Sequence, residues 1–167
     1  MTSPPTESRA ITKDEARDTM ELLSLKNDDL DPRLPPARIH GGSDHIMLAI
    51  HDRARLAEMA YDLDEGRDVM RQHGVVTIML VHAGDDRAFP VGNAFASGGV
   101  LEDPATGAAA AAFTGYLRDL GWPHGGSFTI RQGDDMGAPS VIEVGLSDEV
   151  GSPVHVSGNA RLIQADR

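Results

Sequence analysis

The residues best suited to chemistry lie where an aspartate, Asp103, precedes the run Thr106, Gly107 and Ala108. Asp103 fits the N-cap position of a helix, and Pro104 fits the first helical position because its missing N–H would be unpaired there anyway. Backbone N–H groups of the run would then point out of the first turn, where they can bind a carboxylate or an enolate oxygen. Asp103 itself could bind a substrate amine or exchange a proton. The pattern predicts an anion-binding helix entrance as the candidate site.

Each of these residues also has a purely structural interpretation. Asp103 as an N-cap would stabilise the helix by about 1 kcal/mol without any further role. Gly107 would allow a neighbouring strand to pack closely against the helix. The preceding carboxylate, Glu102, is expected to pair with another side chain or to face solvent. For Asp103 both interpretations stay open at the level of sequence.

Two further candidates lie outside this stretch. Gln132 and Gly133 begin a glycine-containing loop whose backbone could close over a ligand at the helix entrance, or could simply connect two strands of a hairpin. His45 begins an apolar strand beside a glycine turn and is the most interesting of the seven histidines, with a hydrogen-bonded structural role as the alternative. No pair of histidines has a metal-ligand spacing such as HxxxH on one helix face, so we expect no metal site.

The element that must position the candidate site is a helix over about residues 104–120. No residue from 104 to 117 is charged, and the first half is almost all alanine. Gly121, followed by Trp122 and Pro123, is a stop signal. A surface helix would carry a charged face, so this pattern predicts a helix that is enclosed on most sides.

Short apolar or alternating stretches predict the strands around that helix. Residues 88–95 are expected to be an edge or irregular segment because Pro90 interrupts them. A capping box at Thr12 and Glu15 predicts a short N-terminal helix, whereas residues 1–10 are expected to fray. The predicted fold class is α+β, with a curled mixed or antiparallel sheet around a central buried helix. The expected strands are 37–40, 45–50, 75–81, 127–131, 140–146 and 153–163.

Length and composition restrict the possible classes of protein. The 167 residues suit one domain, residues 37–167, preceded by an N-terminal extension, residues 1–36, with a short helix and a linker. The net charge of -11 argues against a nucleic-acid or anionic-membrane partner. The absence of cysteine excludes a thiolate nucleophile, a disulfide and a zinc–cysteine site. No apolar run approaches the roughly 20 residues needed to span a bilayer, and the N-terminus lacks an apolar signal region, so a soluble cytoplasmic protein is the default expectation.

Four stretches resemble, in the right order, motifs of the phenazine-biosynthesis PhzF-like family, which shares the diaminopimelate epimerase fold. Residues 98–109, GGVLEDPATGAA, are similar to the family's signature, and residues 132–140, QGDDMGAPS, resemble its QG…MGRPS loop. Residues 42–45, GSDH, resemble the glycine turn before a strand of its second domain, and residues 156–160, VSGNA, resemble its closing V-x-G-x-A strand. The resemblance covers roughly residues 37–167 and matches the second domain of that family.

This resemblance implies a particular active-site arrangement. Family members are pseudo-twofold pairs of domains, with the active site in the cleft between two helix entrances. Catalysis there resembles proton shuttling without a metal or a cofactor. The general acid/base glutamate belongs to the first domain and has no counterpart in this chain. Asp103 is kept, whereas Ala108 stands where the phenazine enzyme has serine, and Gly92 and Ala138 stand where arginines are usual.

The resemblance therefore implies an isomerase or epimerase that moves a proton on a small carboxylate-bearing metabolite. A second chain would complete its site, either a second copy in a homodimer or a complementary first-domain chain. The alternative is a non-catalytic or truncated half-domain that binds small ligands or a partner. The expected catalytic residue is Asp103. The expected substrate-binding residues are Thr106, Gly107, Ala108, Gln132, Gly133 and His45.

Overall fold

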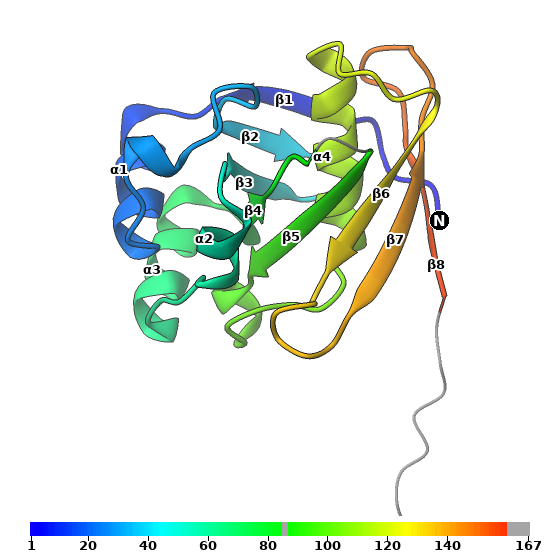
Figure 1. Cartoon of the computed structure of the whole chain (residues 1–167). Helices are drawn as coiled ribbons and strands as arrows, with labels where there is room; N and C mark the ends of the chain where they lie inside the picture. Colours follow the sequence, from blue (N-terminus) through cyan, green and yellow to red (C-terminus); the bar gives the residue numbers. More distant parts are fainter. Residues whose placement is uncertain (85–86, 160–167) are drawn as a thin grey trace, which may run out of the picture.

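The computed structural model of the chain describes residues 1–84 and 87–159, which form one mixed sheet of eight strands in sequence order (Figure 1). Neighbouring strands are antiparallel except for the parallel pairs β3–β4 and β5–β6. The strands are β1 (Glu7–Ala10), β2 (Ala37–His40), β3 (Asp44–Ala49), β4 (Thr77–Val81), β5 (Ala88–Ala94), β6 (Ser127–Gln132), β7 (Ser140–Gly145) and β8 (His155–Gly158).

The sheet curls so that its last strand meets the start of the chain. The amino group of Met1 donates to the Val156 carbonyl at 2.8 Å, and the Val156 N–H donates to the Met1 carbonyl at 2.7 Å. The Ser3 N–H donates to the Val154 carbonyl at 2.9 Å. These bonds hold the N-terminal segment against β8. The next residues of the chain form β1, which is the strand at the opposite edge of the sheet. The expected curled sheet is confirmed.

The helices divide between the two faces of the sheet. They are α1 (Lys13–Leu22), α2 (Arg53–Ala57), α3 (Leu63–His73) and α4 (Gly107–Asp119), with short 3-10 turns η1 (Asn27–Asp29) and η2 (Ala96–Gly98). Figure 1 shows α1, α2 and α3 gathered on one side, while α4 lies on the concave side among the strands. Within the described part of the chain, no helix is long and apolar enough to span a membrane.

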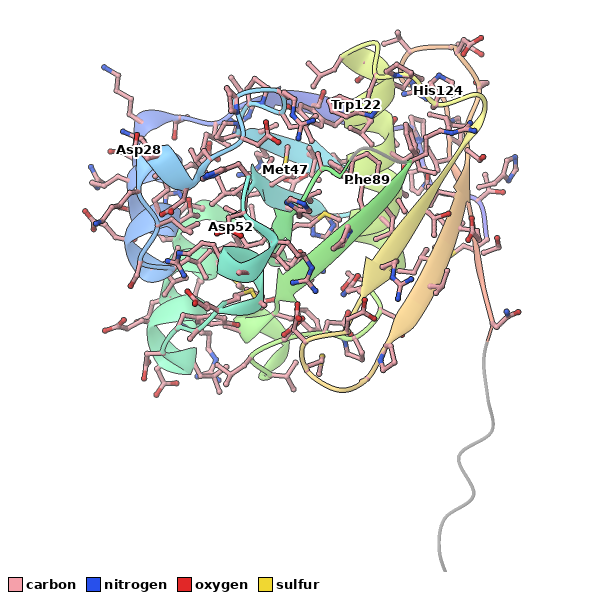
Figure 2. The ribbon with its side chains drawn as sticks, viewed as in Figure 1. Asp28, Met47, Asp52, Phe89, Trp122 and His124 are labelled. Carbon is pink, nitrogen blue, oxygen red and sulfur yellow. The ribbon has the colours of Figure 1, made fainter. Side chains whose placement is uncertain are left out.

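The concave side of the sheet holds the larger hydrophobic core, centred on α4. Every residue of α4 from Ala109 to Arg118 is buried, which confirms the expected enclosed helix. The aromatic rings of Phe89, Phe113 and Phe128 pack edge to face, with centroids 5.2 and 5.5 Å from Phe89. Figure 2 shows Phe89 on β5 and Met47 on β3, two members of this core.

The small side chains of α4 explain how the sheet can approach it so closely. Alanine favours the helix, and its single methyl group leaves the helix backbone accessible to neighbouring strands. Gly41, at the end of β2, lies so near the helix that a Cβ there would stand 2.8 Å from the Ala112 nitrogen. Gly115, on α4 itself, lies equally close to the side chain of Thr6, where a Cβ would collide with the Thr6 hydroxyl oxygen. The alanine run therefore serves packing as well as helix formation.

Three predictions about the elements were wrong. Residues 1–10 do not fray, because the exposed edges of β2 and β8 offer backbone groups with which this segment pairs. The segment containing Pro90 is a central strand, β5, and its proline carbonyl accepts from the His82 N–H at 2.9 Å. The central helix begins at Gly107 rather than at residue 104. The last residues of the predicted strand 153–163, from 160 on, lie outside the described part of the chain.

Candidate functional site

A row of buried polar side chains lies on the concave face of the sheet, one from each of four neighbouring strands. Side chains alternate between the two faces of a strand, and the neighbours two positions away from these residues belong to the core around α4. All four residues are completely buried. They are His45 on β3, Thr77 on β4, Asn93 on β5 and Gln132 on β6. The candidate site is built around Asn93 and Gln132, the two members of this row that bind the start of α4.

Thr106, the N-cap residue of α4, is the centre of the hydrogen bonds at this end. Its N–H donates to Gln132 Oε1 at 3.2 Å, and its hydroxyl accepts from Gln132 Nε2 at 3.0 Å. Asn93 Nδ2 donates to the same hydroxyl at 2.5 Å. The hydroxyl in turn donates to Asp103 Oδ2 at 2.5 Å. Because three side chains bind Thr106, the start of the helix is fixed by β5 and β6.

Asp103 lies three residues before the helical cap, so the prediction that it is the N-cap was wrong. The reason is tertiary: the Asp103 N–H donates to the Asn93 carbonyl at 3.0 Å, and its own carbonyl accepts from Gln132 Nε2 at 2.5 Å. These bonds hold the backbone extended beside β5. The carboxylate is partly exposed, accepts from the Thr106 hydroxyl, and is kept at the helix entrance.

The first turn of α4 keeps unused donors beside that carboxylate. The Thr106 N–H is satisfied by Gln132, so it is not available to a ligand. No acceptor for the N–H groups of Gly107 and Ala108 occurs among the described residues, and both residues are partly exposed. The positive end of the helix dipole adds to the attraction for an anion. The entrance can therefore hold a carboxylate or an enolate oxygen next to Asp103.

The loop between β6 and β7 forms a wall of this entrance, as well as a hairpin connection. Gly133 has a φ of 80°, and a Cβ there would stand 3.2 Å from the Pro104 Cα. The loop closes on itself through the Ala138 N–H, which donates to the Gly133 carbonyl at 3.0 Å. An ion pair at 2.8 Å between Arg53 and Asp135 attaches the loop to α2. Gln132 and Gly133 therefore lie at the helix entrance, where the sequence predicted them.

His45 has the structural role that the sequence left as the alternative. The ring Nδ1 lies 2.7 Å from the Thr77 hydroxyl, and Nε2 lies 3.0 Å from the Ser43 hydroxyl. Burial lowers the pKa of His45 to about 4, so the ring is neutral at pH 7. Since both ring nitrogens are occupied, this geometry does not support the predicted substrate-binding role of His45.

Asn93 is the residue of the site that the sequence reasoning missed. Its side-chain oxygen Oδ1 is buried and is the one such side-chain atom without a hydrogen-bond partner in the part of the chain that the structure describes. Its Nδ2 group binds Thr106, and its carbonyl binds the Asp103 N–H. The available signal was a single amide side chain inside the otherwise apolar end of β5. Among the same described residues, no cluster of three acidic or histidine side chains could hold a metal ion.

The fold and the site together define a class of protein. A curled mixed sheet around a buried helix is the diaminopimelate epimerase-like arrangement. The sequence model of the PhzC-PhzF family, described as phenazine biosynthesis-like protein, matches residues 1–165, and the chain belongs to this family. The match includes the N-terminal 36 residues as well as the domain that follows them.

Solved structures support the same assignment. A PhzF-family protein from Bacillus anthracis superposes with a TM-score of 0.72 at 16% identity, over 93% of this chain and 55% of that one. A predicted epimerase from Pseudomonas aeruginosa gives a TM-score of 0.69 at 25% identity, over 97% of this chain and 57% of that one. A PhzF-family protein from Enterococcus faecalis gives 0.64 at 16% identity, over 96% and 52%. No curated protein matches the chain. The chain thus spans little more than half the length of these structures.

Proposed function

We propose that this chain is an isomerase or epimerase subunit that moves a proton on a small carboxylate-bearing metabolite without a cofactor. The observation that carries the proposal is the position of the Asp103 carboxylate beside the unused N–H groups of Gly107 and Ala108. The family assignment and the likeness to a predicted epimerase support the same reaction class.

The chemistry follows from what each group can do. The substrate carboxylate would accept hydrogen bonds from the Gly107 and Ala108 N–H groups. A base removes the proton next to that carboxylate, and the electron pair left on carbon moves onto the carboxylate oxygen as an enolate. The helix entrance stabilises that oxygen because its donors are already in place. Returning a proton to the opposite face, or to another carbon, completes epimerisation or isomerisation.

Returning a proton to the opposite face needs a second acid/base group, and Asp103 supplies one of the two. We propose that a second chain supplies the other, either a second copy across a twofold axis or a complementary first-domain chain. The length comparison supports this, since each of the similar solved structures contains nearly as much chain again. Gln132 and Gly133 would form the wall that this chain contributes to the shared cleft.

The test is exchange of the α-proton of small carboxylates with deuterated water, followed by proton NMR. A panel of amino, hydroxy and dicarboxylic acids is needed because the substrate is not identified. Asp103→Asn should abolish the exchange, since the amide cannot accept or return a proton. The matched control is Asp148→Asn, which changes an exposed aspartate beside His124, near the other end of α4 (Figure 2).

Light scattering on the same samples gives the oligomeric state. Exchange in the dimer that is lost on dilution to the monomer would support a shared site. Binding of carboxylates without any exchange, by a folded dimer or after addition of a co-encoded partner, would overturn the proposal. It would instead favour the alternative of a non-catalytic half-domain.

A further inference from the structure

A cavity lies on the opposite face of β5 from α4. Its volume is about 480 Å³, and it is lined by Met59, Tyr61, Val100, Leu101, Glu102 and Met136. These residues come from the segment between α2 and α3, the segment before the helix entrance, and the loop between β6 and β7. Binding sites for small molecules have volumes in this range.

The orientation of Glu102 separates this cavity from the helix entrance. Glu102 forms a bridge with Ala94, and its Oε1 lies 3.8 Å from the place of a Cβ on Gly92. Gly92 alternates along β5 with Val91 and Asn93, which face α4. The Glu102 side chain is therefore on the outer face of the sheet, whereas the adjacent Asp103 is held at the entrance of α4.

Glu102 is a half-buried carboxyl group with no hydrogen bond or ion pair to any other described residue. Burial raises its pKa, and the nearby negative charge of Asp135 acts in the same direction. The positive charge of Arg53 is paired with Asp135 at 2.8 Å and not with Glu102. Removing a carboxylate from water without a partner is unfavourable. The position therefore favours a ligand that brings a positive charge.

The remaining walls of the cavity are apolar and accessible. Val100, Leu101 and Met136 are 47, 52 and 42% exposed, which is high for side chains of this kind. The Tyr61 hydroxyl donates to the Leu101 carbonyl and so holds the segment between α2 and α3 against the segment before α4. Methionine side chains adapt to ligands of different shape. The site thus combines an apolar surface with one unpaired carboxyl group.

We propose that this cavity binds a small amphipathic cation, a primary ammonium group carried on an apolar body. The ammonium would donate to the Glu102 carboxylate, and the apolar body would lie against Met59, Leu101 and Met136. Charge complementarity selects this occupant, since the one acidic group that lines the cavity, Glu102, attracts cations and repels carboxylates. The inference is independent of the proposed proton transfer, because that site lies on the other face of β5.

The test uses the full chain with its methionine methyl groups labelled with carbon-13. The probes are 2-phenylethylammonium, the neutral 2-phenylethanol and the anionic 3-phenylpropionate. The ammonium should shift the NMR signals of Met59 and Met136 saturably, and leave the buried methionines unchanged. It should bind about tenfold more tightly than the alcohol, as expected for one partly screened ion pair, and the carboxylate should bind weakest. The buried reference methionines are Met47, Met70 and Met79.

Two variants separate the charge from the apolar wall. Glu102→Gln should lower the affinity for the ammonium to that of the alcohol, whereas Glu143→Gln, at an exposed position of β7, should leave it unchanged. Val100→Ser should weaken all three probes alike, and the reference methionines report whether each variant is folded. Equal binding of ammonium and alcohol, or an unchanged affinity in Glu102→Gln, would overturn the proposal. So would shifts of Met59 and Met136 that depend on protein concentration without any probe, since a second copy would then fill the cavity.

Discussion

The Gln132 side chain on β6 binds the backbone N–H and the hydroxyl of Thr106, the N-cap residue of helix α4. Its Oε1 accepts from the Thr106 N–H at 3.2 Å, and its Nε2 donates to the Thr106 hydroxyl at 3.0 Å. One amide from a distant strand therefore binds the N-cap residue itself, as the N3 side chain of a capping box would, while no side chain among the described residues caps the N–H groups of the first turn of α4. The position of the candidate site depends on this contact, because Thr106 also binds the Asp103 carboxylate.

Replacing this amide is therefore expected to affect both stability and the site. Gln132→Leu keeps the volume but leaves the Thr106 N–H and the Asp103 carbonyl without these partners at a partly buried position. We expect the free energy of unfolding to fall by about 2–3 kcal/mol, measured by urea denaturation. Gln72→Leu is the control, since Gln72 makes one exposed hydrogen bond to Asp18 and should change stability by less than about 1 kcal/mol. Equal effects of the two substitutions would contradict this account of the α4 cap.

Much of the fold could be predicted from the sequence because its signals are local. The uncharged alanine run has no solvent-facing side, so it had to be enclosed, and the β-branched stretch that contains β4 is an evident buried strand. The start of α4 could not be predicted in the same way. Asp103 and Pro104 fit the local rules for a helix start, but bonds from Asn93 and Gln132 hold this segment extended. The tertiary contacts outweigh a capping preference of about 1 kcal/mol.

The candidate site was predicted in part for a related reason. Asp103, Gln132 and Gly133 do meet at the helix entrance, and a glycine loop could be expected to lie near a backbone that it can approach closely. His45 belongs to the same polar row, but the hydroxyls of Ser43 and Thr77 already occupy its ring. Its neighbour across the sheet is set by strand pairing, and strand pairing is not visible in a single sequence.

The loop that covers the helix entrance offers a matched pair of glycines for a second prediction. Gly133 and Gly137 have nearly the same positive φ, 80° and 77°, so alanine is strained at both. At Gly133 a Cβ would also collide with the Ala138 carbonyl oxygen and approach the Pro104 Cα to 3.2 Å, whereas nothing lies within 4 Å at Gly137. Gly137→Ala should cost about 1 kcal/mol of unfolding free energy, and Gly133→Ala about 2–3 kcal/mol.

Thermal and urea unfolding of these two variants would check the difference. Gly133→Ala should in addition shift the amide NMR signals of Gly107 and Ala108, because the loop must move away from Pro104. A similar loss of stability in both variants would mean that the close approach of Gly133 to the helix entrance has no energetic consequence.

A third prediction concerns the mildly acidic range, where His45 should oppose folding. The ordinary pKa of histidine is about 6.5, and burial lowers that of His45 to about 4. Between these two pKa values, His45 is therefore protonated in the unfolded chain and neutral in the folded chain. The stability that depends on a neutral His45 ring is fully present above about pH 6.5 and is lost as the pH falls toward 4. Compared with His45→Gln, the wild-type protein should lose about 1–2 kcal/mol more stability between pH 7 and 5. Parallel pH curves for the two proteins would exclude a neutral, buried His45.

A fourth prediction concerns stronger acid, where Glu15 should control unfolding. Glu15 is buried at the start of α1, where Arg9 binds its two oxygens at 2.8 and 2.9 Å and Arg38 binds it at 3.0 Å. The hydrogen bonds from Arg9, against the opposing effect of burial, lower the pKa of Glu15 from 4.5 to about 2. Folding therefore keeps Glu15 ionised over a pH range in which the unfolded chain takes up a proton.

The sign of the effect follows directly. The stabilisation from Glu15 is complete above about pH 4.5 and is lost as the pH falls toward 2, and it amounts to about 3 kcal/mol. Glu15→Gln should lower the free energy of unfolding by about that amount at pH 7 and by much less at pH 2.5, measured by urea denaturation at each pH. Asp14→Asn is the control, since Asp14 is an exposed neighbour whose single ion pair among the described residues is with Arg17. If Glu15→Gln destabilised the protein equally at both pH values, the ion pairs that join α1 to β1 and β2 would contribute nothing through the charge of Glu15.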